Sequence, residues 1–256
     1  MPQLRLWTKE ELILAFNLYL KIPFGKTHST NKDIIYLASL INRTASSVAL
    51  RLANFASVDP VLQARGIKGM DGGKKIVQPI WDEFFNNQEE LIFLSEKILA
   101  EKENTSIEKK YDIPDLKGED ILRMVKTRVN QSVFRQMVLS NYNNKCAITA
   151  IDIPELLLAS HIIPWSKNEE HRLNPENGIC FSTLYDKAFD KGLIGINTNH
   201  EIIFSDSIKK KKETEFYNRY FSSIENEKII VAQKYLPRKE FLEYHLDTIF
   251  NKQTIL

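Results

Sequence analysis

The sequence predicts an α+β fold, in which a helical N-terminal part precedes a segment of the order strand, loop, strand, helix. In the first part, Thr8, Asn31 or Thr30, and Thr44 each stand shortly before an apolar segment with helical spacing, where a capping residue belongs. In the second part, an apolar run that starts near Leu156 ends at His161, which is typical of a short strand. An Asn-Gly turn and a second short apolar run follow it.

The order of elements divides the chain into two domains. Residues 1–100 are predicted to form a helical domain, 101–118 a charged linker containing Pro114, and 119–256 the second domain. The helices expected in the first domain cover residues 12–20, 34–41 and 45–55, with a further helical turn that starts at Asp59-Pro60 and a long helix from Pro79 to about residue 103. In the second domain we expect a helix over 119–142, strands over 200–204 and 228–232, and a last helix from Pro237, in which His245 is structural.

Composition excludes several classes of protein. The 256 residues are 43% hydrophobic and 27% charged, as in ordinary globular proteins, and the net charge of +2 leaves any contact with polyanions to local patches. No apolar run of eighteen residues and no signal peptide stand out, so a cytoplasmic location is expected. Cys146 and Cys180 form no CxxC pair and are predicted to be reduced, buried thiols rather than ligands of a structural zinc.

The segment from the first strand to Gly192 holds the residues with the most chemistry. His161 ends the strand, and a neutral imidazole can take a proton near neutral pH. Ser182 or Thr183 caps a short helix on which Asp186 and Asp190 lie four residues apart, so that both carboxylates point the same way and suit a hard divalent cation. Taken singly, each of these residues is ordinary: a structural histidine and a solvated acidic face.

This arrangement resembles the HNH endonuclease family, whose ββα-metal motif cuts nucleic acid with one divalent ion. The resemblance rests on His161 before Ile-Ile-Pro, on Asn177 in the Asn-Gly turn, and on the helical position nine residues later. It implies that His161 and Asn177 are catalytic and that Asp186, Asp190 and Ser160 hold Mg²⁺ or Mn²⁺. The sequence has Ser160 where many members have an acidic residue or His, and Asp186 where the family has a second His.

The segments around these residues extend the resemblance. NNKCAITAIDIPELLLASHIIPWS and NPENGICFSTLYDKAFDKGLI are similar to a bacterial branch of restriction endonucleases, over about residues 130 to 200. The resemblance implies that the second domain is a ββα-metal (HNH) nuclease domain. The helical domain before it is expected to be an N-terminal DNA-recognition domain, on the two features described next.

Two features of the first domain suggest contact with DNA. The helix pair over 34–41 and 45–55 resembles a helix-turn-helix, and its second helix would present Ser46 and Ser47 to the major groove, with Arg43 and Arg51 beside them. A plain helical bundle is the alternative.

The second feature is a glycine-rich basic loop, and a basic helix in the nuclease domain adds one more candidate. The loop, residues 64–75, is of a kind that approaches phosphates through bare backbone, or it is a mobile surface loop. Its basic residues, together with one from the helix over 119–142, are Arg65, Lys68, Lys74, Lys75 and Arg135.

The sequence therefore predicts a metal-dependent endodeoxyribonuclease of restriction type that hydrolyses phosphodiester bonds in double-stranded DNA. A requirement for modified DNA stays open. One such site cuts one strand, so a homodimer is expected for a double-strand break. The alternatives are a DNA-binding protein with a degenerate HNH module that does not cut, and a nuclease acting on RNA or non-duplex DNA.

Overall fold

The computed structural model describes residues 5–112 and 119–251, with the side chains of residues 119–122 left out. The chain divides into two compact units, Met1–Val133 and Phe134–Leu256, and the division falls inside the helix that links them. The elements of the first unit are α1 Lys9–Lys21, α2 Lys32–Leu40, α3 Ala45–Val58, α4 Pro60–Ala64, the 3-10 turn η1 Asp71–Gly73, α5 Lys74–Phe84, α6 Gln88–Lys102, α7 Ile107–Lys110 and most of α8 Glu119–Asn141.

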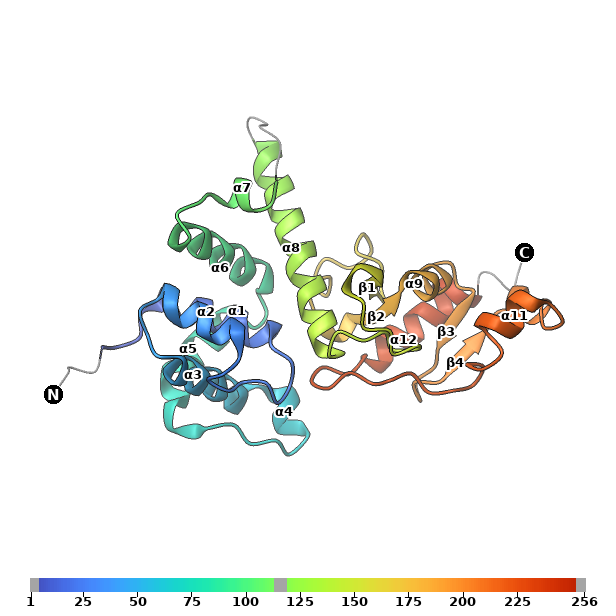
Figure 1. Ribbon diagram of the computed structural model, residues 1–256, viewed down its shortest axis with the longest axis horizontal. Helices are drawn as coiled ribbons and strands as arrows, with labels where there is room; N and C mark the ends of the chain where they lie inside the picture. The colour runs from blue at the N-terminus through green and yellow to red at the C-terminus, as the bar shows by residue number, and fades with distance from the viewer. Residues whose placement is uncertain (1–4, 113–118, 252–256) are drawn as a thin grey trace. The chain divides into compact units, whose positions relative to one another are not determined.

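The first unit is built around α1, which contacts α2, α3, α5 and α6 (Figure 1). The predicted capping box begins this helix: the Thr8 hydroxyl accepts the Glu11 N–H, and the Glu11 carboxylate accepts the Thr8 N–H. Ten consecutive residues of α1 are buried, as expected for a central helix. At the centre, the Phe16 ring stacks on Phe55 at 4.8 Å and on Trp81 at 4.9 Å. The helices predicted over 34–41 and 45–55 are confirmed as α2 and α3, which are capped by Asn31 and Thr44, and the turn predicted to start at Asp59-Pro60 is α4.

A buried carboxylate ties the end of the first unit together. Glu96 on α6 accepts hydrogen bonds from Lys21 at 2.8 Å and from Tyr111 at 2.9 Å, and it pairs with Lys110 at 3.2 Å. Burial alone would raise the pKa of Glu96, but the two lysine charges outweigh it and lower that pKa to about 2. Residues 107–112, which lie in the predicted linker, therefore include a helical turn that packs on α6; residues 113–118 lie outside the described part of the chain.

The long helix predicted from Pro79 is wrong. Pro79 lies inside α5, which begins five residues earlier at Lys74, and the chain turns at residues 85–87 before α6 begins. Proline is favoured at a helix start because it lacks an N–H. A helix can also contain proline after its first turn, at the cost of one backbone hydrogen bond. The two glycines directly before Lys74 are typical of a loop, so the sequence did not indicate that the helix begins at Lys74.

The second unit consists of two small antiparallel sheets with helices around them. Its elements are the end of α8, the 3-10 turn η2 Pro154–Leu156, β1 Leu157–His161, the 3-10 turn η3 Pro175–Asn177, β2 Gly178–Ser182, α9 Thr183–Asp190, β3 Ile194–Ile196, β4 Ile202–Phe204, α10 Asp206–Lys209, α11 Glu215–Tyr220, α12 Lys239–His245 and the π-helical turn η4 Leu246–Phe250. β1 pairs with β2, and β3 pairs with β4. Helix α9 packs on β1 and β2 (Figure 1), so the predicted order strand, loop, strand, helix is confirmed.

Close packing explains one glycine of this unit. Gly178 is the partner of His161 in the β1–β2 register, and a Cβ atom there would lie 2.3 Å from Val138 Cγ2 and 2.9 Å from the Phe134 ring. Only glycine lets α8 approach the start of β2 this closely. The contact matters for the site because Phe134 also packs on His161.

Other predictions for this unit have mixed outcomes. The strand over 228–232 is wrong: Lys228 forms only an isolated bridge with Glu201. β3 was not predicted, whereas the strand predicted over 200–204 is confirmed by β4. Cys146 and Cys180 are both free and buried, as predicted. His245 is structural, since its ring stacks on Phe189 at 3.6 Å and its Nε2 bonds the Phe189 carbonyl at 3.0 Å.

The architecture as a whole is α+β, as predicted, with strands confined to the second unit in the described residues. Of the helices that the structure describes, none combines the length and the apolar character needed to cross a membrane.

Candidate active site

A pocket of about 400 Å³ opens between the end of β1 and helix α9 in the second unit. It brings together four of the five residues predicted as catalytic or metal-binding: His161, Ser160, and Asp186 and Asp190 of α9. Its lining residues are Ala159, Ser160, His161, Pro164, Trp165, Asp186, Lys187, Asp190, Lys191 and Ile249.

His161 is held on three sides. Its ring stacks on Phe134 with centroids 3.9 Å apart and planes 12° apart, and Trp165 meets it edge-on at 5.5 Å and 88°. Nε2 lies 2.9 Å from the backbone carbonyl of Arg172, which can only accept a hydrogen bond. The neutral imidazole therefore carries its proton on Nε2, which leaves the lone pair of Nδ1 free.

The environment also keeps this imidazole neutral. Burial lowers the pKa of His161, and the hydrogen bond to the Arg172 carbonyl offsets only part of that shift. Near neutral pH the ring is therefore unprotonated at Nδ1 and able to accept a proton. These are the properties that a general base requires.

Asn177, predicted together with His161 as catalytic, is fully buried and bonded entirely to backbone. Its Oδ1 accepts the Ile163 N–H at 2.8 Å, and its Nδ2 donates to the carbonyls of Ile163 at 3.1 Å and His171 at 3.2 Å. The Asn177 carbonyl accepts the Ile162 N–H at 3.0 Å. Asn177 thus fastens both ends of the loop that follows His161, which makes it a positioning residue.

We expect Asn177→Ala to lower the free energy of unfolding by about 1–3 kcal/mol, because it leaves buried backbone groups without partners. Urea denaturation followed by circular dichroism measures the change. Asn199→Ala, at an exposed turn position, is the matched control and should change stability by less than about 0.5 kcal/mol. An equal change in the free energy of unfolding in both variants would contradict the structural role assigned to Asn177.

The two carboxylates of α9 lack a cation within hydrogen-bond reach in the described residues. Burial raises the pKa of Asp186, an effect that the Ser160 hydroxyl and the Lys187 charge only partly offset. Burial and the negative charge of Asp186 together raise the pKa of Asp190. A bound cation would therefore stabilise the ionised form of both carboxyl groups.

Ser160 adds a third oxygen to this setting. Its hydroxyl is buried and lies close enough to lower the pKa of Asp186, yet Oγ has no hydrogen-bond partner of good geometry among the described residues. Two carboxylates and an unpaired hydroxyl are oxygen donors of the type that Mg²⁺ and Mn²⁺ select. The described residues contain no group of three or more His, Cys, Asp or Glu able to hold a metal, so water and substrate would have to complete the shell of a hard ion.

Several residues in or beside the pocket were not predicted from the sequence. Trp165 and Phe134 restrain the imidazole, and Trp165 in turn lies under the guanidinium of Arg172 at 5.2 Å. Lys187 and Lys191 line the pocket beside the carboxylates. The signal for the lysines was present in the sequence, since each follows directly after one of the two aspartates.

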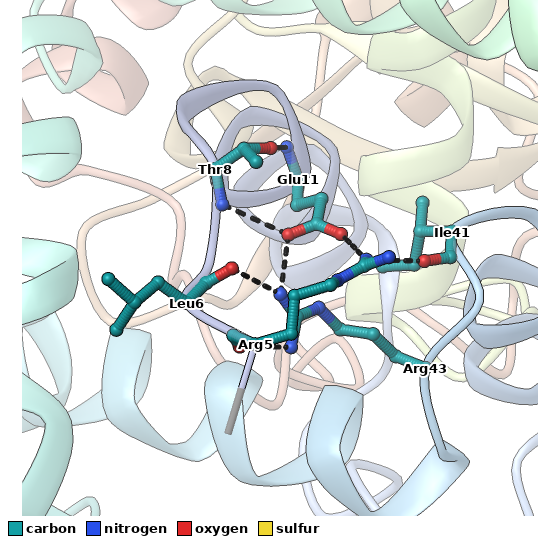
Figure 2. Close-up of polar contacts among 6 residues, drawn as sticks. All are labelled: Arg5, Leu6, Thr8, Glu11, Ile41 and Arg43. Carbon is teal, nitrogen blue, oxygen red and sulfur yellow. Dashed lines mark hydrogen bonds and ion pairs between the residues drawn. The ribbon is translucent and has the colours of Figure 1, made fainter. Parts of the chain in front are cut away.

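Arg43, predicted to contact DNA, is bound inside the first unit (Figure 2). Its guanidinium pairs with Glu11 at 2.7 Å and donates to the carbonyls of Arg5 at 3.1 Å and Leu6 at 2.7 Å. Arg5 bonds the same carboxylate and the Ile41 carbonyl. Only 9% of the Arg43 side chain is exposed, so it anchors the segment before α1 rather than facing a ligand.

Arg51 and Arg135, which were also predicted to contact DNA, make contacts within the protein as well. Arg51 is buried, lies over the Trp7 ring at 4.8 Å and donates to Asn54 at 3.1 Å; burial lowers its pKa. Arg135 donates to the Leu157 carbonyl at 2.6 Å and to the Pro154 carbonyl at 2.9 Å, which secures the start of β1.

The remaining predicted DNA contacts lie at the surface of the first unit. Five residues are exposed and Ser47 is half-buried; the exposed ones are Ser46, Arg65, Lys68, Lys74 and Lys75. The glycines of the basic loop serve packing in part, since a Cβ at Gly69 would lie 2.3 Å from the Ser57 nitrogen and one at Gly73 2.1 Å from Asn54. The loop therefore packs against α3, while its basic residues remain exposed and the Arg65 guanidinium lies over the Phe24 ring at 5.7 Å.

The comparison with known families agrees with this geometry. Residues 146–197 match the HNH endonuclease family, and this segment spans β1, β2, α9 and β3 with the residues of the pocket that these elements carry. No curated protein matches the chain. This segment of the second unit is therefore similar to the HNH endonuclease family.

Proposed function

We propose that this protein is an endodeoxyribonuclease of restriction type that hydrolyses phosphodiester bonds in duplex DNA with one divalent ion. The observation that carries the proposal is that the neutral imidazole of His161 and the carboxylates of Asp186 and Asp190 line one pocket. These residues lie in the segment that matches the HNH endonuclease family. HNH nucleases typically use a divalent metal, and the oxygen donors here favour Mg²⁺ or Mn²⁺.

In this proposal His161 is the general base. Its Nδ1 takes a proton from the attacking water, and the resulting imidazolium is stabilised by the hydrogen bond from Nε2 to the Arg172 carbonyl. Asp186, Asp190 and Ser160 would hold the ion, which when bound supplies a Lewis acid for the phosphoryl oxygen and the leaving group. Asn177 keeps the loop after His161 in place.

The first unit is proposed to bind DNA. Its support is the exposed set of Arg65, Lys68, Lys74 and Lys75 around the start of α5, and the exposed N-terminal turn of α3 with Ser46. Lysines that contact phosphates contribute salt-dependent, sequence-independent affinity.

Removal of three of these charges tests that role in the full chain. We expect the triple change Lys68→Gln, Lys74→Gln and Lys75→Gln to weaken DNA binding and to reduce the slope of log K against log salt by about 1 for each phosphate that is no longer neutralised. Fluorescence anisotropy of a labelled duplex at several salt concentrations measures the slope. Lys97→Gln with Lys102→Gln, exposed on α6, is the control. If the triple variant keeps the slope of the unmodified protein, the proposed surface is in the wrong place.

Plasmid cleavage tests the function itself. The purified protein should nick or linearise plasmid with Mg²⁺ or Mn²⁺ and do neither with a chelator. A panel of duplex DNA, single-stranded DNA and RNA, with unmodified and modified duplexes, separates the proposed substrate from the alternatives. A protein that binds DNA but cuts none of these would be a DNA-binding protein with a degenerate HNH module.

The same time course bears on assembly. One imidazole and one ion serve one scissile phosphate, so cutting both strands in one encounter requires two copies of the chain. We propose a homodimer on DNA for that reason. Linear plasmid formed without a nicked intermediate, by a protein that light scattering finds monomeric on DNA, would contradict it.

A further inference from the structure

Helix α9 carries a second charged pair beside the carboxylates. Lys187 follows Asp186 and Lys191 follows Asp190, and all four side chains line the same pocket. Residues that are adjacent in a helix differ by about 100° in direction, while residues four apart lie on one face. The lysines therefore form a row parallel to the row of carboxylates.

Neither lysine is used to hold the protein together. Both are exposed, and among the described residues no hydrogen bond or ion pair joins either side chain to another group. Other lysines of the protein are engaged in this way: Lys212 pairs with Glu225 at 2.8 Å, and Lys110 pairs with Glu96 at 3.2 Å. The lysines of the pocket are thus available to a ligand.

The charges of the pocket add up in a way that favours phosphate. The two carboxylates and the two lysines cancel, so a divalent ion bound at the carboxylates would bring these groups to a net charge of about +2. A stretch of nucleic acid strand carries one negative charge per phosphate, and two phosphates would balance that excess. Attraction of the substrate would then be strongest when the metal is present.

The spacing of the lysines also suits a strand. Four helical residues rise about 6 Å, and each strand of duplex DNA presents one phosphate per about 3.4 Å of its axis. Long, flexible lysine side chains can span the remaining difference, and they bind phosphate as point charges without a fixed geometry.

From these observations we infer that Lys187 and Lys191 are substrate-binding residues that hold the phosphates next to the scissile one, so that the cleaved strand runs along α9. The inference rests on the proposed nuclease function and adds the path of the substrate to it. A purely local role, in which the lysines only keep the two carboxylates ionised, is the competing explanation.

The test uses full-length protein carrying His161→Ala, so that bound DNA stays intact in the presence of Mg²⁺. In that background, a double variant with Lys187→Gln and Lys191→Gln is compared with the protein that keeps both lysines. Fluorescence anisotropy of a labelled duplex at several salt concentrations measures DNA binding. Because two fewer phosphates would be neutralised, the slope of log K against log salt should fall by about 2. Lys187→Arg with Lys191→Arg keeps the charges and should keep the slope.

The matched control is Lys210→Gln with Lys211→Gln, which removes two exposed charges from the same unit. An unchanged slope in the pocket variant, an equal decrease of slope in the control, or no binding at low salt would each overturn the inference. Plasmid cleavage by the protein with His161 intact, run in parallel, separates this failure from failure of the nuclease proposal: cleavage with an unchanged slope rejects only the lysine path.

Discussion

His161→Ala is expected to lower the rate of DNA cleavage by about 10²–10⁴-fold while DNA binding is kept, since a positioned general base contributes about that much. The loss falls on the chemical step because the imidazole takes a proton and does not anchor the substrate. Single-turnover cleavage of a labelled duplex at saturating protein measures the rate, and anisotropy measures binding. His28→Ala, at an exposed position of the first unit, is the control and should cleave at the unmodified rate.

The pH dependence gives an independent check on His161. The neutral form is the active one, and burial lowers the pKa of this imidazole below its ordinary value of 6.5. The rate should therefore be level around neutral pH and fall on the acid side, below pH 6.5, as Nδ1 becomes protonated. A rate in His161→Ala equal to that of the unmodified protein, or the same acid limb in that variant, would contradict the assignment.

Asp186→Asn is expected to reduce metal-dependent cleavage by about 10³-fold or more. A bound ion contributes several kcal/mol of charge stabilisation, and each 1.36 kcal/mol corresponds to a factor of ten in rate. Asparagine keeps the shape of the side chain but removes the charge that the ion needs. Isothermal titration with Mn²⁺ should show weaker binding in this variant, and Asp190→Asn should show a loss in the same direction.

Two variants on the same unit complete this test. Asp206→Asn removes an exposed carboxylate from α10 and should leave both metal binding and cleavage unchanged. Ser160→Ala should weaken Mn²⁺ binding less than Asp186→Asn does, because a neutral hydroxyl is a poorer ligand than a carboxylate. Tight Mn²⁺ binding in Asp186→Asn would show that the ion sits elsewhere.

Local patterns were sufficient for the elements that build the pocket. A short apolar run, an Asn-Gly pair and a serine at a helix start are signals within a few residues, and β1, β2 and α9 formed where these signals stand. The spacing of Asp186 and Asp190 fixed their common face once the helix was known. The prediction that the imidazole and both carboxylates share one site came from the resemblance to the HNH endonuclease family, and all three side chains line one pocket.

Contacts between residues that are distant in the chain could not be predicted from the sequence. Arg43 forms an ion pair with Glu11, which lies 32 residues earlier in the chain. No pattern within a few residues of Arg43 indicates such a pair. Trp165 also gained its role from a spatial contact, since its edge restrains the imidazole of His161. The strand predicted over 228–232 failed for a related reason: β propensity reflects packing on a sheet, and only Lys228 found a bridge partner there among the described residues.

The central claim is that this pocket binds a divalent ion and a DNA phosphate together. A crystal structure of the His161→Ala protein with duplex DNA and Mn²⁺, using the anomalous signal of manganese, tests it most directly. We expect one ion in contact with a carboxylate oxygen of Asp186 or Asp190 and with an oxygen of a backbone phosphate, which would lie beside the position of the missing imidazole. An ion that touches neither aspartate, or DNA whose phosphates all lie outside the pocket, would contradict the assignment.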